Sequence, residues 1–235
     1  MNTYKYVFFA CLLSIFRSYA QTDAQGIFQK HVEAIGGKAA IQSVTDMTLS
    51  MTTETPRGVS ETEMKFKMPL KYALSVYAGG QQMMSSTYDG AKLVSSSPWG
   101  GPQKPIEGDL AKAEILKNHP FAEHYFEEAG VKVVASEQTE MDGKSYQKVV
   151  LGLGTTQWTN FYDLQTGLKH MTVAENKTPR GTFESKSIFT DYKKFKGSEI
   201  LFAAKRQQTT GMGAITSELQ SIKINKGLKD KEFEN

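Results

Sequence analysis

Of the residues in this sequence, two histidines and a carboxylate in one short segment most closely resemble a metal site or an acid–base pair. His119, Glu123 and His124 form the pattern H-x-x-x-E-H. The inverted zinc-protease motif is H-x-x-E-H, in which both histidines share one helix face. Here the spacing is one residue longer and Pro120 follows the first histidine, so the side chains are not expected to converge on a metal. We predict an ordinary amphipathic segment, and we expect His31 on the solvated side of an earlier helix.

Motifs for covalent or nucleotide chemistry are absent from the sequence. It contains no G-x-S-x-G and no phosphate-binding loop, and Gly152-Leu153-Gly154 lacks the third glycine and the following helix of a dinucleotide site. The three serines at 95–97 read as a polar loop. An enzyme acting on a lipid is the weakest functional hypothesis, because no nucleophile is paired with a base. We predict a protein that is not an enzyme and has no catalytic residue, cofactor or metal.

The methionines are the one feature of the sequence that indicates ligand binding. Seven lie in or beside predicted strands: Met47, Met51, Met64, Met68, Met83, Met84 and Met171. Flexible thioether side chains suit a surface that accepts apolar ligands of variable shape. The alternative is that these residues only fill a core beneath helices, and the residue pattern alone leaves both interpretations open.

Residues 47–77 predict the sheet on which these methionines lie. Apolar and polar residues alternate through three consecutive segments, as in Met64-Lys65-Phe66-Lys67. Alternation with period two places one set of side chains on each face of a strand. One face is rich in methionine and aromatic residues and the other is charged or hydroxylated, which is typical of an antiparallel sheet with one solvated side. Proline and glycine at 56–58 and Pro69 mark the turns.

The rest of the chain predicts a long meander interrupted by helices. We expect a helix over 24–35 and a short turn over 38–43, then five strands up to residue 96. Two helical segments follow at 109–118, with Asp109 as N-cap, and at 120–129. About seven further strands complete the order. A long antiparallel sheet curls, so the fold class is mainly β (α+β), an unclosed antiparallel β half-barrel whose concave face is covered by the helices.

The first twenty residues have the features of a secretory signal. Lys5 precedes an apolar run over 6–16, and Ser18-Tyr19-Ala20 fits a signal-peptidase site. We therefore predict residues 1–20 as a signal peptide cleaved after Ala20, and residues 21–235 as a single domain. Removing Lys5 and Arg17 from the 28 basic residues leaves 26 against 25 acidic ones, which gives no support for nucleic-acid binding.

Several short segments together resemble a known family. They are His31 to Lys38, Tyr88 to Gly90, Tyr162 to Leu168 and Thr190-Asp191-Tyr192-Lys193. Their order and spacing resemble outer-membrane lipoprotein-sorting proteins of the LolA/LolB-like superfamily, in its Bacteroidetes-type branch, over essentially the whole chain after residue 20. Each segment is short and weak alone, and their specificity comes from the combination.

The resemblance implies a non-catalytic fold that holds lipid. It implies an unclosed β-barrel whose mouth is plugged by helices and whose cavity takes acyl chains of lipoproteins or other lipids. Carrier members use an arginine on an early strand to hold the lid closed. The early strands here contain none, and Arg57 lies in a turn instead. This departure puts lipoprotein hand-over in doubt and leaves general lipid binding intact.

Combining the residue pattern with the resemblance, we predict a periplasmic lipid- or lipoprotein-binding carrier. Its partners would be acyl chains, with transient membrane contact and no nucleic acid. The predicted lipid-binding residues are Met47, Met51, Met64, Phe66, Leu74, Met83, Trp99, Trp158 and Phe202. The alternative is a non-catalytic envelope interaction module, in which a closed half-barrel docks a protein partner through an edge strand or through the loop that contains Trp99.

Overall fold

A computed structural model describes residues 24–55, 58–98, 100–178, 181–210 and 213–234. Its main feature is one antiparallel sheet, whose strands run in the order β6-β5-β4-β3-β2-β1-β14-β13-β12-β11-β10-β9-β8, with β7 paired to β5. The strands are β1 (Asp46–Thr55), β2 (Gly58–Lys67), β3 (Lys71–Ala78), β4 (Gln81–Tyr88), β5 (Lys92–Ser97), β6 (Gly101–Pro102), β7 (Ile106–Glu107), β8 (Lys132–Met141), β9 (Lys144–Leu153), β10 (Thr156–Asp163), β11 (Lys169–Thr178), β12 (Gly181–Lys194), β13 (Leu201–Thr210) and β14 (Gly213–Ile224).

The predicted alternation sets the register of the first strands. Leu49 on β1 lies opposite Met64 on β2, and Met47 lies opposite Phe66, with all four side chains buried. A shift by one residue would turn this apolar set outward, so the pattern specifies the pairing strongly. On the other face Lys65 remains partly exposed. The prediction of an apolar and a solvated face is confirmed here.

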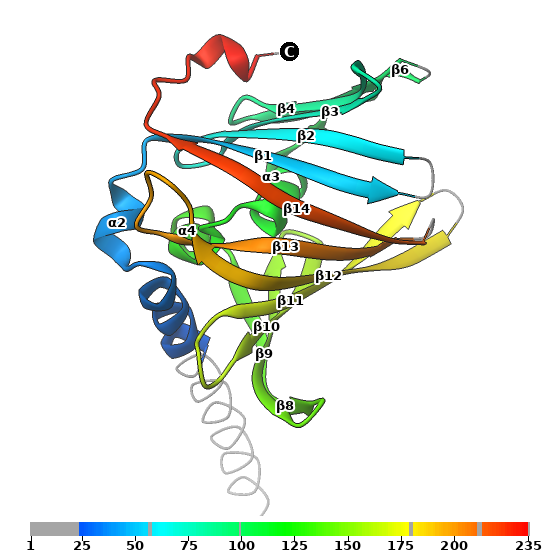
Figure 1. The fold of residues 1–235 in the computed structure, drawn as a ribbon. Coiled ribbons are helices and arrows are strands. Elements are labelled where there is room, and N and C mark those ends of the chain that lie inside the picture. The colour runs from blue at the N-terminus through cyan, green and yellow to red at the C-terminus, as the bar shows by residue number, and fades with distance from the viewer. Residues whose placement is uncertain (1–23, 56–57, 99, 179–180, 211–212, 235) are drawn as a thin grey trace, which may run out of the picture.

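The sheet curls without closing, and its concave side is covered by helices. These are α3 (Gly108–Asn118) and α4 (Ala122–Ala129), which form one insertion between β7 and β8. They lie behind the central strands in the view of Figure 1. The predicted order of helix, five long strands, helical insertion and seven strands is confirmed, as is the mainly β half-barrel. The first strand after the leading helix, β1, pairs with the last, β14, at the centre of the sheet.

The N-terminal helical segment closes one end of the half-barrel. Residues 24–35 are helical, and α2 (Lys38–Gln42) follows after a break at Gly36 and Gly37. Phe28 from this helix contacts Phe126 of α4 edge-on, with ring centroids 5.2 Å apart, and Tyr162 of β10 at 5.8 Å. The helix, α4 and the sheet therefore share one hydrophobic core. One detail differs from expectation, because α3 begins at Gly108 with Glu107 at the N-cap, and Asp109 lies in the first turn.

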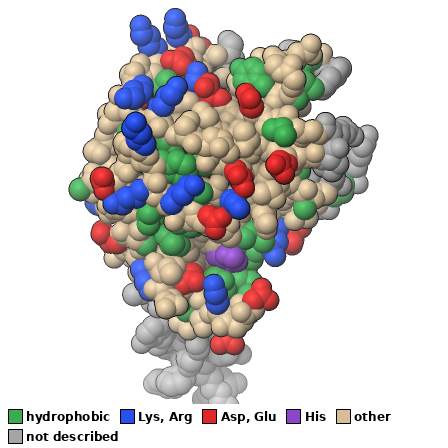
Figure 2. All heavy atoms as spheres, viewed as in Figure 1, with side chains coloured by type: hydrophobic (Ala, Val, Ile, Leu, Met, Phe, Trp, Pro, Cys, Tyr) green, Lys and Arg blue, Asp and Glu red, His purple; other side chains and the backbone are tan. Residues whose placement is uncertain are grey.

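The convex face of the sheet carries charges of both signs, which Figure 2 shows interspersed over the surface that faces the viewer. A C-terminal segment with the short helix η1 (Asp230–Glu232) is held to β2 and β3 by lysine–carboxylate pairs. Among the described helices, none has the length and apolar character needed to cross a bilayer.

Candidate functional site

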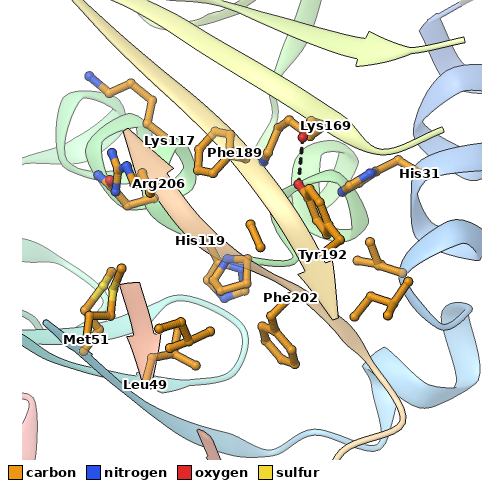
Figure 3. A pocket seen from close by; sticks show the side chains of 17 residues that line it. His31, Leu49, Met51, Lys117, His119, Lys169, Phe189, Tyr192, Phe202 and Arg206 are labelled. Carbon is orange, nitrogen blue, oxygen red and sulfur yellow. Dashed lines mark hydrogen bonds between the residues drawn. The ribbon is translucent and has the colours of Figure 1, made fainter. Parts of the chain in front are cut away.

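An apolar cavity lies between the concave face of the sheet and the α3–α4 insertion. Its volume is about 90 Å³. Apolar side chains from β1, β2, β13 and β14 form one wall, and the connection between α3 and α4 forms another (Figure 3). The lining residues are His31, Ile35, Leu49, Met51, Met64, Lys117, Asn118, His119, Pro120, Lys169, Phe189, Tyr192, Leu201, Phe202, Ala203, Arg206 and Leu219.

The structure divides the predicted lipid-binding residues into three groups. Met51, Met64 and Phe202 line the cavity. Met47, Phe66 and Trp158 are buried in the core around it, and Leu74 packs against that core while half-buried. Met83 is half-buried on β4 without joining this core cluster, and Trp99 falls outside the described residues. The cavity therefore collects three of the nine predicted residues, and their role in lipid binding remains a prediction.

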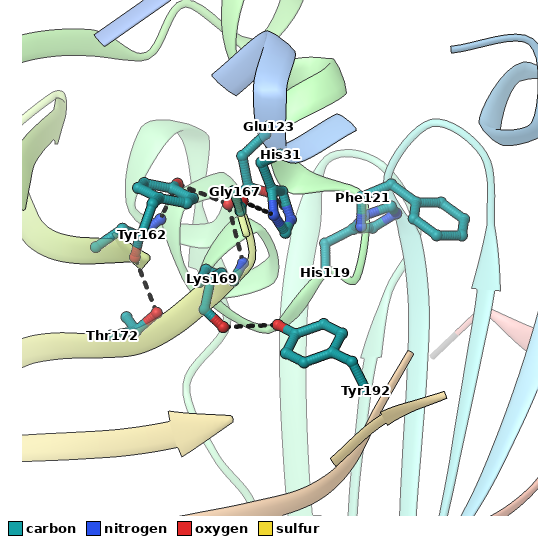
Figure 4. Close-up of polar contacts among 10 residues, drawn as sticks. His31, His119, Phe121, Glu123, Tyr162, Gly167, Lys169, Thr172 and Tyr192 are labelled. Atoms are coloured by element: carbon teal, nitrogen blue, oxygen red, sulfur yellow. Dashed lines mark hydrogen bonds and ion pairs between the residues drawn. The ribbon is translucent and has the colours of Figure 1, made fainter. Parts of the chain in front are cut away.

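A buried polar cluster centred on Glu123 borders the cavity (Figure 4). The Oε1 atom of Glu123, on α4, accepts hydrogen bonds from the Tyr162 hydroxyl at 2.7 Å and from Lys169 Nζ at 3.0 Å. Asn160 Nδ2 donates to the Tyr162 hydroxyl oxygen at 2.9 Å, and the Tyr192 hydroxyl donates to the Lys169 carbonyl at 2.7 Å. One carboxylate thus links the helical insertion to β10 and β11, and Tyr192 extends the link to β12.

His31 belongs to this cluster, so its expected position on the solvated side of the helix is wrong. Its side chain is 2% exposed, and Nδ1 lies 3.0 Å from the Gly167 carbonyl. Gly167 has φ +75°, and a Cβ there would lie 2.8 Å from a Lys30 side-chain carbon and 3.0 Å from its backbone oxygen. Only glycine allows this turn to adopt its conformation and to approach the helix so closely. Lys30 Nζ also donates to the Leu164 carbonyl.

Burial and charge set opposite ionisation states within the cluster. Burial raises the pKa of Glu123, but the ammonium of Lys169, the charge that His31 carries in acid and the hydrogen bond from Tyr162 outweigh it and bring the pKa to about 2. Burial lowers the pKa of His31, and the nearby Glu123 carboxylate opposes this shift without cancelling it. Nδ1–H of neutral His31 donates to Gly167, and Nε2 lies 3.7 Å from Glu123 Oε2. Glu123 is therefore a carboxylate paired with Lys169, and His31 is neutral at pH 7.

His119 presents an unsatisfied donor at the cavity. It is 1% exposed, and the Phe121 backbone N–H donates to its Nδ1 at 3.0 Å. Nε2 must then carry the proton of the neutral ring. Burial lowers the pKa of His119 to about 3, so the ring is neutral at pH 7. Nε2 has no hydrogen-bond partner among the described residues, which is unusual for a buried polar atom.

Arg206, on β13, brings a positive charge to the same cavity. Its guanidinium donates to Ser187 Oγ from Nε at 3.3 Å and from Nη2 at 3.0 Å, and it lies over the Phe189 ring at 5.7 Å. Burial lowers its pKa, although an arginine stays protonated in proteins. Within the described ranges no carboxylate lies within ion-pair distance of it.

Two further hollows follow α3 away from the apolar cavity. One of about 110 Å³ is lined mainly by polar side chains, and it shares Lys117, Asn118 and Arg206 with the apolar cavity. The other is a groove of about 750 Å³ that shares Glu114 with the polar hollow and includes Leu110 and Trp158. The shared residues place the three hollows in sequence along α3, from its C-terminal end to its N-terminal end.

No group of three or more histidine, cysteine or acidic side chains is placed to hold a metal ion in the described part of the chain. Sequence reasoning missed most of the polar residues at the site. One signal was available, because three segments that carry the family resemblance contain His31, Tyr162 and Tyr192, which all lie in or beside the polar cluster. Arg206 had a second signal: Arg57 and Arg180 belong to Pro-Arg-Gly sequences, which predict turns, whereas Arg206 belongs to a segment that predicts a strand.

Solved structures share this architecture, whereas no known family's sequence profile and no curated protein sequence matches the chain. A LolA superfamily protein from Nitrosomonas europaea aligns with a TM-score of 0.55 and 13% identity, over 90% of this chain and 97% of that one. A DUF1329 family protein from Desulfovibrio piger gives a TM-score of 0.55 and 14% identity, over 92% and 97%.

A domain assigned to outer membrane lipoprotein sorting, from Vibrio parahaemolyticus, gives a TM-score of 0.53 and 11% identity, over 92% of this chain and 96% of that one. Likeness at this level of identity concerns the fold and leaves the ligand open. The unclosed sheet, the helical insertion on its concave face and these alignments agree with one another, and the chain therefore shares the fold of these solved structures, as its sequence segments predicted.

Proposed function

We propose that the protein binds acyl chains of lipids or lipoproteins on the concave face of its half-barrel and carries them within the bacterial envelope. The observation that carries this proposal is the apolar cavity between the sheet and α3–α4. Leu49, Met51, Met64, Phe202 and Leu219 give it a lining that an alkyl chain can bury against. Methionine side chains can also adapt to chains of different length.

The cavity volume indicates how the ligand would enter. Sites for small molecules typically measure about 300–1,000 Å³, and this cavity measures about 90 Å³. An acyl chain therefore fits only when α3 and α4 move away from the sheet.

The proposal includes no catalysis. The described side chains that line the apolar cavity include no serine, threonine or cysteine to act as a nucleophile. The predicted signal peptide and the likeness to a lipoprotein-sorting domain support a periplasmic location and a role in outer membrane biogenesis. Loading would require transient contact with a membrane, and no resident cofactor takes part.

Binding of an uncharged acyl probe tests the proposal. The protein, exported by its own leader and stripped of lipid, is titrated with a pyrene-labelled long-chain alcohol while pyrene fluorescence is recorded. Leu219 is buried, lines the cavity and lies opposite Met51, so Leu219→Trp should fill the space and abolish binding. The matched control is Val59→Trp, at a side chain that is 59% exposed on β2. Equal binding by wild type and Leu219→Trp, or no binding by wild type, would contradict the proposal.

A docking function for a protein partner is the second candidate, and one observation favours it. Strand β8 pairs only with β9 among the described strands, and its Val134 is 53% exposed. A long edge strand offers free backbone groups to an added strand from another protein. If wild type binds no acyl probe, this candidate takes precedence, and Val134→Lys should then remove the partner recovered from envelope extracts.

A further inference from the structure

We propose that Arg206 is the head-group site of the carrier, and that the ligand is a single-chain amphiphile with one small anionic group, a carboxylate or a phosphate. This inference rests on the proposed function and specifies its ligand. The acyl chain would lie in the apolar cavity, and its head group would lie at Arg206 beside the polar hollow (Figure 3).

The charge balance of the cavity points to an anion. Three cationic side chains line it, and two of them have their own carboxylate: Lys117 pairs with Glu114 at 2.5 Å, and Lys169 pairs with Glu123 at 3.0 Å. Arg206 is the third, and no described carboxylate reaches it. Arg206 is half-buried, and a charge partly withdrawn from water is normally paired, because an unpaired charge loses hydration without compensation. The lining therefore has one uncompensated positive charge, which one anionic group would neutralise.

The donors and acceptors around Arg206 support an oxygen-rich head group. Ser187 Oγ takes bonds from two of the guanidinium nitrogens, which leaves further N–H groups for a ligand. His119 Nε2–H lines the same cavity without an acceptor. A carboxylate or phosphate accepts several hydrogen bonds at once, and arginine binds either of them in a two-pronged geometry.

The arrangement of the three hollows gives the ligand a direction. The apolar cavity lies at the C-terminal end of α3, the polar hollow of about 110 Å³ with Arg206 comes next, and the larger groove follows toward the N-terminal end of the helix. The polar hollow is also lined by Thr172, Ser185 and Gln208, whose hydroxyl and amide groups can solvate a head group of a few atoms. A bound amphiphile would therefore lie with its alkyl end in the apolar cavity and its anionic end at the polar hollow.

A comparison of four ligands by isothermal titration calorimetry tests the inference on the exported protein. Hexadecanoate and palmitoyl lysophosphatidic acid carry the anionic group, whereas hexadecanol and palmitoyl lysophosphatidylcholine carry no net charge. Loss of a charged hydrogen-bonded partner typically weakens binding about 10- to 100-fold. Wild type should therefore bind one or both anionic ligands about 10- to 100-fold more tightly than hexadecanol, and the stronger of the two identifies the head group.

Two variants locate the effect. Arg206→Gln should bind hexadecanoate and hexadecanol with equal affinity, whereas Lys205→Gln should keep the wild-type difference. Lys205 neighbours Arg206 on β13, and its exposed ammonium pairs with Asp191 and Glu218 on the convex face, so it matches the charge change outside the cavity. Melting curves of the ligand-free variants verify folding.

Each outcome bears on a separate claim. Equal binding of hexadecanoate and hexadecanol by wild type would overturn the head-group site and leave acyl binding standing, and this comparison needs no variant. An Arg206→Gln protein that keeps the wild-type preference would also overturn it. Failure of every ligand to bind wild type would overturn the proposed function itself, and the inference with it.

Discussion

The two faces of the sheet differ in how they hold charge. On the convex face, Lys65 pairs with Glu232 at 2.9 Å, and Lys67 and Lys71 both reach Asp230 at 2.9 Å, with side chains that are 28–57% exposed. On the concave face, Lys169 pairs with Glu123 at 3.0 Å, with exposures of 8% and 1%. The distances differ by only 0.1 Å, whereas the exposures of the side chains differ widely.

This difference in exposure determines which ion pairs position elements of the fold and which contribute little to stability. Exposed pairs gain little, because water and salt screen them. A buried pair is not a strong source of stability either, but removing one partner destabilises the fold, because the other partner remains as a buried charge without compensation. The concave pair therefore determines where α4 sits on the sheet, and the unpaired Arg206 leaves the same face prepared for an anion.

The largest expected effect comes from Glu123→Gln. This change leaves Lys169 buried without its carboxylate, so we expect the free energy of unfolding to fall by about 3–5 kcal/mol. Chemical denaturation monitored by tryptophan fluorescence measures it, because Trp158 contacts Phe126 on the same helix. The matched control is Glu127→Gln, whose exposed carboxylate lies on the same helix and should cost little. A loss below 1 kcal/mol for Glu123→Gln would mean that the buried pair does not anchor α4.

The dependence of stability on acidic pH tests the same ion pair. The pKa of Glu123 falls from its ordinary value of 4.5 to about 2 in the folded protein, so the unfolded state binds the proton more readily. The stability that Glu123 contributes is therefore complete above pH 4.5 and is lost as the pH falls toward 2. Wild type should lose stability more steeply than Glu123→Gln across this window. Parallel curves for the two proteins would contradict the assignment of Glu123 as an ionised partner of Lys169.

Arg206→Met should produce an intermediate effect of the opposite sign. It removes a charge that has no anion in the ligand-free protein and replaces it with an apolar side chain of similar length. We expect the ligand-free protein to gain on the order of 1 kcal/mol of stability. Thermal unfolding before and after addition of hexadecanoate measures the change, and the ligand should stabilise the wild type more than the variant. A ligand-free variant less stable than wild type by 2 kcal/mol or more would assign Arg206 a structural role instead.

Glu232→Gln on the convex face should have the smallest effect. An exposed pair of this kind contributes at most about 1 kcal/mol, and high salt should reduce the difference from wild type further. Thermal unfolding at low and high ionic strength tests this expectation. A loss comparable to that of Glu123→Gln would remove the contrast between the two faces, and would show that the C-terminal segment is held by more than its lysine pairs.

Much of the fold could be predicted from the sequence, because local patterns determine it. Alternation at Met64 to Lys67 specifies which face each side chain occupies, and Asp-Gly at 142–143 specifies a hairpin that the structure contains between β8 and β9. The long helical insertion after five strands was also recognisable from its composition. These features depend on residues that are neighbours in the chain.

The site depends on long-range contacts, and much of it could not be predicted. Glu123 and Lys169 are 46 positions apart, and His31 meets Gly167 across 136 positions. His31 was assigned to solvent because helical periodicity gives no information about what packs against a polar position. Arg206 lies on the concave side because it is in phase with Phe202 along β13, and the register between β12 and β13 places it opposite Phe189. The strand pattern around Arg206 does not indicate which residue of a neighbouring strand lies opposite it.

Photo-crosslinking tests the central claim that acyl chains occupy the concave cavity. A hexadecanoate analogue with a diazirine near the end of its chain is bound to the exported protein and irradiated, and labelled residues are identified by peptide mass spectrometry. We predict labels on Leu49, Met51, Met64 and Leu219, which line the cavity. Labels confined to exposed apolar residues such as Val59, Met84 and Val134 would contradict the account.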